Sequence, residues 1–222
     1  MVLNFALIFS ILPFAIFNDG TVPEFKGGEK KLNSFITNSI IYPEYAKQNC
    51  LQGTVYISFQ LTKNGRIYNS EVKKGFGVDL DKEALRVVRL TSGRWIVPSA
   101  FDTTQAMVLP INFALKEYNC NQRSADEIKT AIEAYKTREN LTKAIINFYD
   151  KKSSGSYSAN DEVTILEFKQ QLGYNERFFE QLLKQGKQKL KQGDKEGACE
   201  DFILIRKLGS EISKEMLSQS CV

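Results

Sequence analysis

Residues 54–62 alternate between apolar and polar side chains along their whole length. The apolar members are Val55, Ile57, Phe59 and Leu61. Because successive side chains of a strand point to opposite faces, this pattern predicts a strand with one buried face. Asn64-Gly65 follows at once, and this dipeptide is the strongest short signal for a tight hairpin. The chain is therefore expected to build an antiparallel sheet around this segment.

Four further elements are expected around the strand at residues 54–62. Residues 66–74 are the expected return strand, whose apolar residues Ile67 and Val72 fall out of phase and so predict a bulge or a strong twist between them. Apolar residues at helical spacing predict helices at 29–41 and 81–91, and alternation returns at 107–116. The order α-β-β-α-β indicates a split βαβ unit. We expect a three-stranded antiparallel sheet in the order second-first-third, with both helices on one face.

The second half of the chain has the pattern of an all-α region. Helices are expected near residues 125–136, 139–151, 161–172, 175–191, 195–208 and 210–220. A Ser-rich loop separates the second of these helices from the third. The predicted class is α+β, with a sheet domain at 21–117 and a helical domain at 118–222.

The first 17 residues are almost wholly apolar. As a helix they would reach roughly 25 Å, which is short of a hydrocarbon core of roughly 30 Å. Residues 1–20 therefore read as a secretory signal peptide. A retained short anchor and a buried structural helix remain the alternatives. Either of the first two readings exports the rest of the chain, which predicts a periplasmic location or tethering to the inner membrane.

Composition excludes several functions. The chain has no histidine, which removes the usual general base and the commonest metal ligand. No glycine-rich phosphate loop or acidic pair compensates, so we predict neither an enzyme nor a cofactor. The net charge of +4 is spread along the sequence, and no basic face predicts binding to nucleic acid.

Four cysteines suit an exported chain, where disulfides persist. Cys199 and Cys221 lie at similar distances on either side of a turn at Gly209, so antiparallel helices would bring them together. If residue 54 pairs near residue 116, Cys50 and Cys120 leave the sheet at one corner. We predict a disulfide between Cys199 and Cys221, with two buried free thiols as the alternative. We predict that Cys50 and Cys120 lie close together, which makes them candidates for a second disulfide.

Several short segments resemble signatures of the TonB C-terminal domain family, at about residues 22–117. They are Pro23-Glu24-Phe25, Gly27-Gly28-Glu29, Tyr42-Pro43-Glu44, Gln52-Gly53-Thr54-Val55, Asn64-Gly65-Arg66-Ile67, residues 80–88, Trp95 with Pro98, and Leu109-Pro110-Ile111-Asn112-Phe113. Each segment is weak alone, whereas their order and spacing are specific. The fold of the family agrees with the order of elements predicted above.

The resemblance implies a binding module. Domains of this family add an extended segment of an outer-membrane receptor to their sheet as a strand, and they transmit energy supplied by ExbB and ExbD. Here residues 18–26 replace the long Pro-rich spacer and reach at most about 30 Å. The sequence therefore predicts a periplasmic module that binds a receptor or another envelope protein. The alternatives are a membrane-tethered energy transducer working with an ExbB/ExbD-type complex, and an envelope scaffold whose sheet packs only on its own helical domain.

The third strand is the expected partner-binding edge. Pro110 lacks an N–H, so it is tolerated in the strand only where that donor would point away from the first strand. This register turns the backbone of Val108, Pro110, Asn112 and Ala114 outward.

Residues 175–221 carry a separate, weaker resemblance to a tetratricopeptide-type repeat, with Gly193-Asp194 at the turn between its helices.

Overall fold

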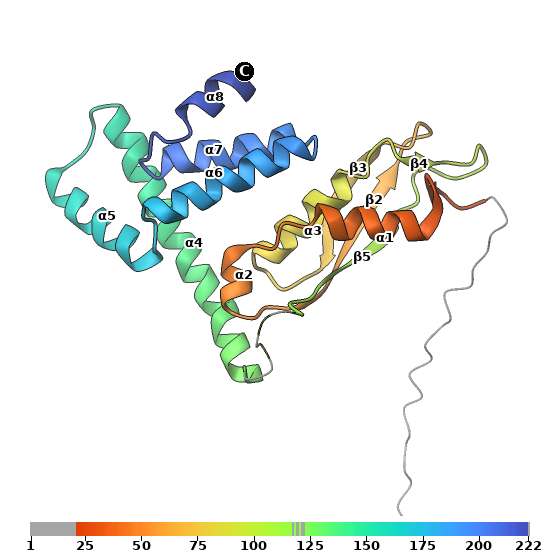
Figure 1. Cartoon of the computed structure of the whole chain (residues 1–222), viewed down its shortest axis with the longest axis horizontal. Coiled ribbons are helices and arrows are strands. Elements are labelled where there is room, and N and C mark those ends of the chain that lie inside the picture. The colour runs from red at the N-terminus through yellow and green to blue at the C-terminus, as the bar shows by residue number, and fades with distance from the viewer. Residues whose placement is uncertain (1–20, 117, 119, 121–122, 222) are drawn as a thin grey trace, which may run out of the picture.

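The computed structural model describes residues 21–116, 118, 120 and 123–221 (Figure 1). The predicted signal peptide or anchor at 1–20 lies outside the described residues. The first part of the chain contains β1 (Glu24–Phe25), α1 (Gly28–Ser39), α2 (Glu44–Gln48), β2 (Gly53–Leu61), β3 (Ile67–Lys74), α3 (Asp79–Arg89), β4 (Trp95–Ile96) and β5 (Met107–Phe113). The second part contains α4 (Ala125–Ser153), α5 (Ala159–Leu172), α6 (Glu176–Lys191), α7 (Lys195–Lys207) and α8 (Lys214–Ser220).

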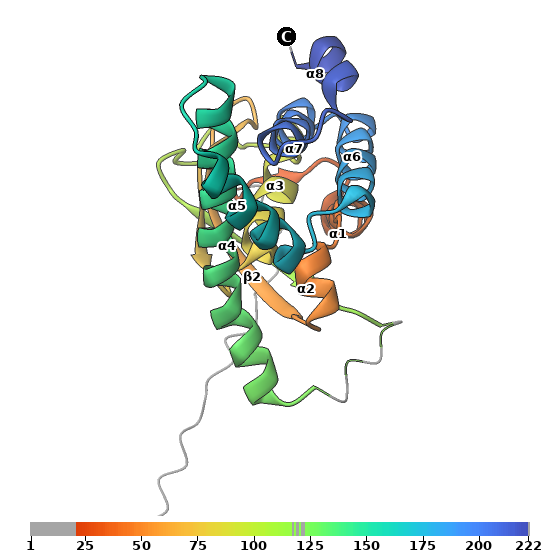
Figure 2. The same cartoon turned by 90° about the vertical axis from the view of Figure 1, so that its left-hand side faces the viewer.

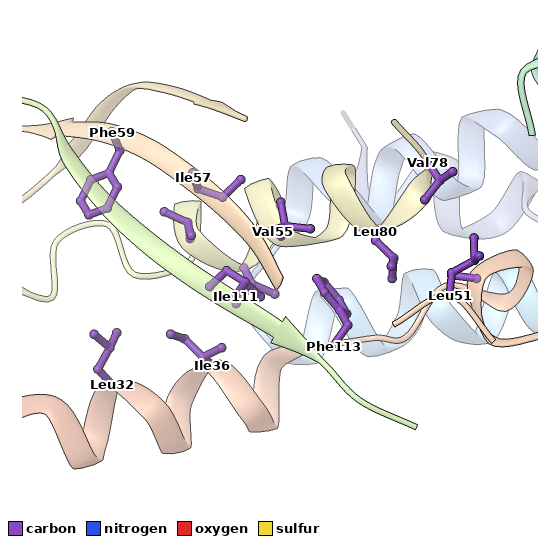
Figure 3. Packing of buried hydrophobic residues seen from close by; sticks show 14 of the residues in the cluster. Leu32, Ile36, Leu51, Val55, Ile57, Phe59, Val78, Leu80, Ile111 and Phe113 are labelled. Atoms are coloured by element: carbon purple, nitrogen blue, oxygen red, sulfur yellow. The ribbon is translucent and has the colours of Figure 1, made fainter. Parts of the chain in front are cut away.

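The main sheet is antiparallel and has the order β3-β2-β5, which is the predicted second-first-third order. The apolar residues of β2 are buried on one face, where α1 and α3 cover them. Figure 3 shows Leu32 and Ile36 on α1 and Leu80 on α3 within the same apolar layer as Ile111. The opposite face of the sheet carries the partly exposed side chain of Tyr56.

A second sheet was not predicted. It has two strands, with Phe25 of β1 opposite Trp95 of β4. Strands of two residues leave no readable periodicity, and what fixes them is tertiary packing. The two rings meet edge to face, and Trp95 Nε1 donates to Thr91 Oγ1 in the core.

The predicted bulge in β3 is present. The pairing of β2 with β3 shifts register twice, and Asn69 takes a left-handed φ of 48°. Asparagine tolerates this conformation better than most residues. The strand is therefore twisted and irregular along the outer edge of the sheet.

The helical part differs from the prediction at its first helix. One helix, α4, of 29 residues replaces the two predicted at 125–136 and 139–151. The prediction divided this stretch where the apolar spacing is interrupted. The stretch contains no glycine or proline to end a helix, so the helix continues through the interruption. A capping box between Ser124 and Glu127 starts it.

Helix α4 belongs to two apolar cores, and Figure 2 shows its length. Its first half adds Ile128, Ile132 and Tyr135 to the core of the sheet part. Its second half packs Ile145 and Phe148 into a separate cluster with the later helices. Both cores are therefore fixed to one continuous helix.

A polar contact joins the two parts a second time. The guanidinium of Arg86 on α3 donates to both carboxylate oxygens of Glu83, to Asp194 at 3.1 Å and to the carbonyl of Ser39. Gln192, in the turn between α6 and α7, accepts from Arg86 and donates to the Ser39 carbonyl. The charged side chains of Arg86 and Asp194 are each only 11% exposed. The turn between α6 and α7 is thus held on the end of α3.

Candidate functional site

Strand β5 is the most regular free edge of the main sheet. It pairs with β2 at seven successive positions, from Gly53 opposite Phe113 to Phe59 opposite Met107. The register has no shift along this length. Among the described residues, no strand pairs with the outer side of β5. An incoming strand would therefore find a straight and regular row of backbone groups.

Three of the four predicted edge residues lie in β5, and all three are exposed. They are Val108, Pro110 and Asn112. The fourth, Ala114, lies one residue past the end of the strand. The prediction that the strand continues to residue 116 was wrong, because the backbone N–H of Leu115 donates instead to the side chain of Gln52. That side-chain bond takes the place of a ladder bond.

The predicted register of β2 and β5 was wrong by four residues. Thr54 lies opposite Asn112 rather than near residue 116. Alternation within a strand defines which side chains share a face, but it leaves open a slip by an even number of residues. Shape and volume in the core decide between such registers, and Ile111 and Phe113 are both almost fully buried in the one observed.

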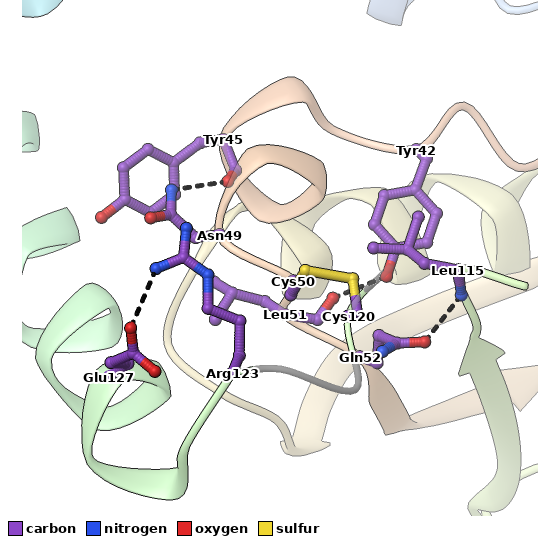
Figure 4. Close-up of a disulfide and its surroundings, with 10 residues drawn as sticks. All are labelled: Tyr42, Tyr45, Asn49, Cys50, Leu51, Gln52, Leu115, Cys120, Arg123 and Glu127. Carbon is purple, nitrogen blue, oxygen red and sulfur yellow. Dashed lines mark hydrogen bonds and ion pairs between the residues drawn. A yellow bond between two sulfur atoms is a disulfide. The ribbon is translucent and has the colours of Figure 1, made fainter. Parts of the chain in front are cut away.

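The cysteine pairs are those that the sequence predicted. The Cα atoms are 5.4 Å apart in Cys50–Cys120 and 5.6 Å apart in Cys199–Cys221, and both pairs form disulfides. Figure 4 shows the first pair at the corner where the chain leaves β5. Although the register behind that prediction was wrong, the chain turns after β5 and returns Cys120 to the same corner.

The corner around this disulfide is tied by polar contacts. The hydroxyl of Tyr42 donates to the carbonyl of Leu51 at 2.6 Å. Burial, reinforced by the nearby charge of Asp79, raises the pKa of Tyr42 to about 12, so this hydroxyl keeps its proton. Tyr45 donates to the carbonyl of Ala131 on α4 at 2.7 Å. These contacts hold α2 between the sheet and α4.

The open face of the sheet carries a hollow beside β5. Tyr56, Lys73, Lys74 and Val108 line this hollow of about 450 Å³. The side chains of Tyr56 and Val108 are 38% and 40% exposed. The alternation of β2 placed Tyr56 on the polar face, yet the sequence reasoning assigned it no role. The sequence did not reveal that the Tyr56 side chain is exposed next to the edge strand, which is the observation that brings it into the candidate site.

The other free edge is less suited to pairing. Strand β3 carries the register shifts and the left-handed Asn69, and its exposed Glu71, Lys73 and Lys74 are charged. Bulges and charged residues are the features that keep edges from pairing. Of the two outer strands, β5 therefore has the more regular and the less charged free edge.

The described part of the chain holds no cluster of three or more potential metal ligands. Within the same residues, which begin at Thr21, no helix is long and apolar enough to cross a membrane.

Part of the chain is similar to a known protein family. Residues 38–115 match the family model described as Gram-negative bacterial TonB protein C-terminal. That family consists of non-enzymatic interaction domains of the cell envelope, which act with outer-membrane receptors in transport. The match supports the resemblance seen in the sequence over these residues. It includes β2, β3, α3 and β5, and so the whole of the candidate edge.

One solved structure is also similar. It is the solution structure of the TonB C-terminal domain of Helicobacter pylori, at 23% identity and a TM-score of 0.34, covering 40% of this chain and 95% of that one. No curated protein matches the chain. The resemblance of residues 175–221 to a tetratricopeptide-type repeat stays a prediction.

Proposed function

We propose that this protein is a periplasmic interaction module that binds an extended segment of an outer-membrane receptor or another envelope protein. The segment would add to the outer edge of β5 as a further antiparallel or parallel strand, a known mode of peptide recognition. The observation that carries the proposal is the free edge of β5, seven regular positions long, within the region matched by the TonB family.

Pro110 defines which backbone groups are available. Its missing N–H is tolerated best when it points away from β2, and this orientation also turns the N–H groups of Val108, Asn112 and Ala114 outward. The partner would pair through these residues and leave a gap at Pro110. Such a gap limits the pairing of identical edges with each other.

The hollow on the open face would take side chains of the added strand. Tyr56 and Val108 offer apolar surface there, and Lys74 lies 6.0 Å from the Tyr56 ring. Side chains of a strand alternate between faces, so every second residue of the partner would lie on the open face, where Val108 is the nearest residue of the hollow. The backbone bonds would supply affinity and the hollow would supply selectivity.

The contacts of the helical part favour binding over a scaffold that only packs on itself. The hydrogen bonds that join the two parts end on Ser39 of α1, Tyr45 of α2, and Lys82 and Arg86 of α3. All of these belong to the helical layer. They leave the edge of β5 and the open face of the sheet available to another protein.

A paired proline substitution in the full chain tests the proposal. Asn112→Pro should keep the fold but abolish capture of synthetic peptides that cover periplasmic segments of outer-membrane receptors, because it removes one outward N–H. Asn112→Ala keeps that N–H and should still bind, which separates the backbone from the side chain. Ile111→Pro should unfold the sheet part by removing an internal ladder bond.

Binding is measured by peptide capture and folding by circular dichroism. Equal capture by Asn112→Pro and the parent would show that β5 is not the site. Loss of capture by Asn112→Ala would move the contact from the backbone edge to the open face.

A further inference from the structure

A cleft of about 1280 Å³ lies between the sheet part and the helical part. Its lining comes from α2, α3, α4, the end of α5, α6, α7 and neighbouring loops, and none of the described residues of β5 belongs to it. Arg86 and Tyr45, which carry two of the hydrogen bonds between the parts, both line it. The cleft is therefore separate from the proposed strand-addition edge.

Arg138 of α4 is the unusual residue in this cleft. It is half-buried, yet no carboxylate of the described residues forms an ion pair with it. Its guanidinium carbon lies 5.7 Å from the ring centre of Tyr45 and 5.0 Å from that of Tyr174. By contrast, Arg86 in the same cleft pairs with two carboxylates.

The two rings hold this guanidinium in a fixed position. The hydroxyl of Tyr45 donates to the Ala131 carbonyl, and that of Tyr174 lies 2.7 Å from Thr142 Oγ1, so neither ring turns freely. A planar guanidinium that contacts aromatic rings keeps its N–H groups free for a carboxylate. Arg138 is thus arranged in advance to bind an anion.

Asp79 supplies the complementary group. It lines the same cleft, and its Oδ1 atom is buried without a hydrogen-bond partner among the described residues. Burial raises the pKa of this carboxyl group, and the nearby backbone N–H groups of Ala46 and Leu80 offset only part of that rise. A carboxylate oxygen left without a donor is rare in a folded protein and calls for an N–H or O–H donor. The guanidinium of Arg138 and Oδ1 of Asp79 therefore both keep hydrogen-bonding capacity that the described residues do not use.

We propose that this cleft is a second binding site, which takes an acidic peptide segment of a partner protein. Arg138 binds a carboxylate of the peptide, and Asp79 Oδ1 accepts one of its backbone N–H groups. A peptide carries both groups, whereas inorganic phosphate carries no N–H. Phe178 provides aromatic surface along the lining for the peptide between its polar groups.

Fluorescence anisotropy with the full chain tests this site. The probes are fluorescein-labelled hexaglutamate and the neutral hexaglutamine of equal length, at low ionic strength. Arg138→Gln should weaken binding of hexaglutamate by roughly ten- to a hundredfold, the range of a charge-assisted hydrogen bond. Lys143→Gln makes the same charge change at an exposed position of α4 outside the cleft, and should change binding by less than about twofold, as for a screened surface charge.

Further variants separate folding from binding. Arg138→Lys keeps the charge but loses the planar fork, so its affinity should fall between those of the parent and Arg138→Gln. Asp79→Asn should also weaken binding, and Asn112→Pro should leave it unchanged because β5 lies elsewhere. The unfolding midpoint of each variant shows whether a loss reflects the site or the fold.

Four results would overturn the proposal. They are no binding of hexaglutamate by the parent, equal binding of hexaglutamine, equal losses in Arg138→Gln and Lys143→Gln, and competition by inorganic phosphate as strong as that by unlabelled hexaglutamate. The last would assign the cleft to phosphate. None of these results bears on strand addition at β5, which its own variants test.

Discussion

Loss of Arg86 is expected to destabilise the chain and to uncouple its two parts. Arg86→Met leaves Glu83 and Asp194 as carboxylates whose side chains are only 7% and 11% exposed. Removing one partner of a buried ion pair costs about 3–5 kcal/mol. Both carboxylates retain a backbone donor, Ile41 for Glu83 and Gly197 for Asp194, so we expect a value near about 3 kcal/mol.

A double-mutant cycle with Asp194→Asn isolates the contact between the parts. Asparagine still caps α7, so this change removes mainly the charge. We expect the two substitutions together to cost less than the sum of their separate effects, by about 1–3 kcal/mol of coupling. Arg89→Met, one turn along the exposed side of α3, is the matched control and should cost less than about 1 kcal/mol.

Urea unfolding followed by two probes measures the effect. The single tryptophan, Trp95, reports on the core of the sheet part, whereas far-ultraviolet circular dichroism is dominated by the helices. The two transitions should coincide in the parent and separate in Arg86→Met. Coupling near zero between Arg86 and Asp194, or coincident transitions in Arg86→Met, would refute the inference that this contact joins the two parts.

Two more predictions concern the disulfides and the pH dependence of stability. The Cys50–Cys120 bond closes 70 residues and Cys199–Cys221 closes 22, so replacing each pair by alanine should lower the free energy of unfolding by about 4 and about 3 kcal/mol, respectively. Denaturant titration of both variants checks the order, which a larger loss from the shorter loop would contradict. Burial raises the pKa of Asp79 from 3.8 to about 6. The folded chain therefore binds this proton more tightly than the unfolded chain, and the contribution of Asp79 to stability should rise by roughly 1–3 kcal/mol as the pH falls from 7 to 4. Asp79→Asn should lack that part of the rise, and identical pH profiles for parent and variant would exclude it.

The long elements were readable because their periodicity is local. The alternation of β2 and the Asn64-Gly65 turn predicted the hairpin, and the split βαβ order predicted the arrangement of the main sheet. The observed end of β5 differs from the predicted end because the side chain of Gln52 accepts the N–H of Leu115 in place of a ladder bond. The two-residue strands β1 and β4 could not be predicted, because only the packing of Phe25 on Trp95 defines them.

The candidate edge was only partly predictable. The missing N–H of Pro110 predicted which backbone groups of the third strand point away from the first strand. Alternation could not decide a slip by an even number of residues, so the register came from the fit of Ile111 and Phe113 in the core. Only the tertiary structure shows that the side chain of Tyr56 is exposed beside Val108.

The sequence by itself determined the class of the fold, the order of the main strands and the Cys199–Cys221 pair, because these follow from repeating patterns and spacing along the chain. The Cys50–Cys120 bond depends on the path of the chain after β5. Tertiary structure decided that α4 is one helix shared by two cores. It also decided that Arg86 meets Asp194 across 108 residues and that Arg138 faces a cleft without an ionic partner. No local pattern encodes these contacts, since each depends on how two separately folded surfaces fit together.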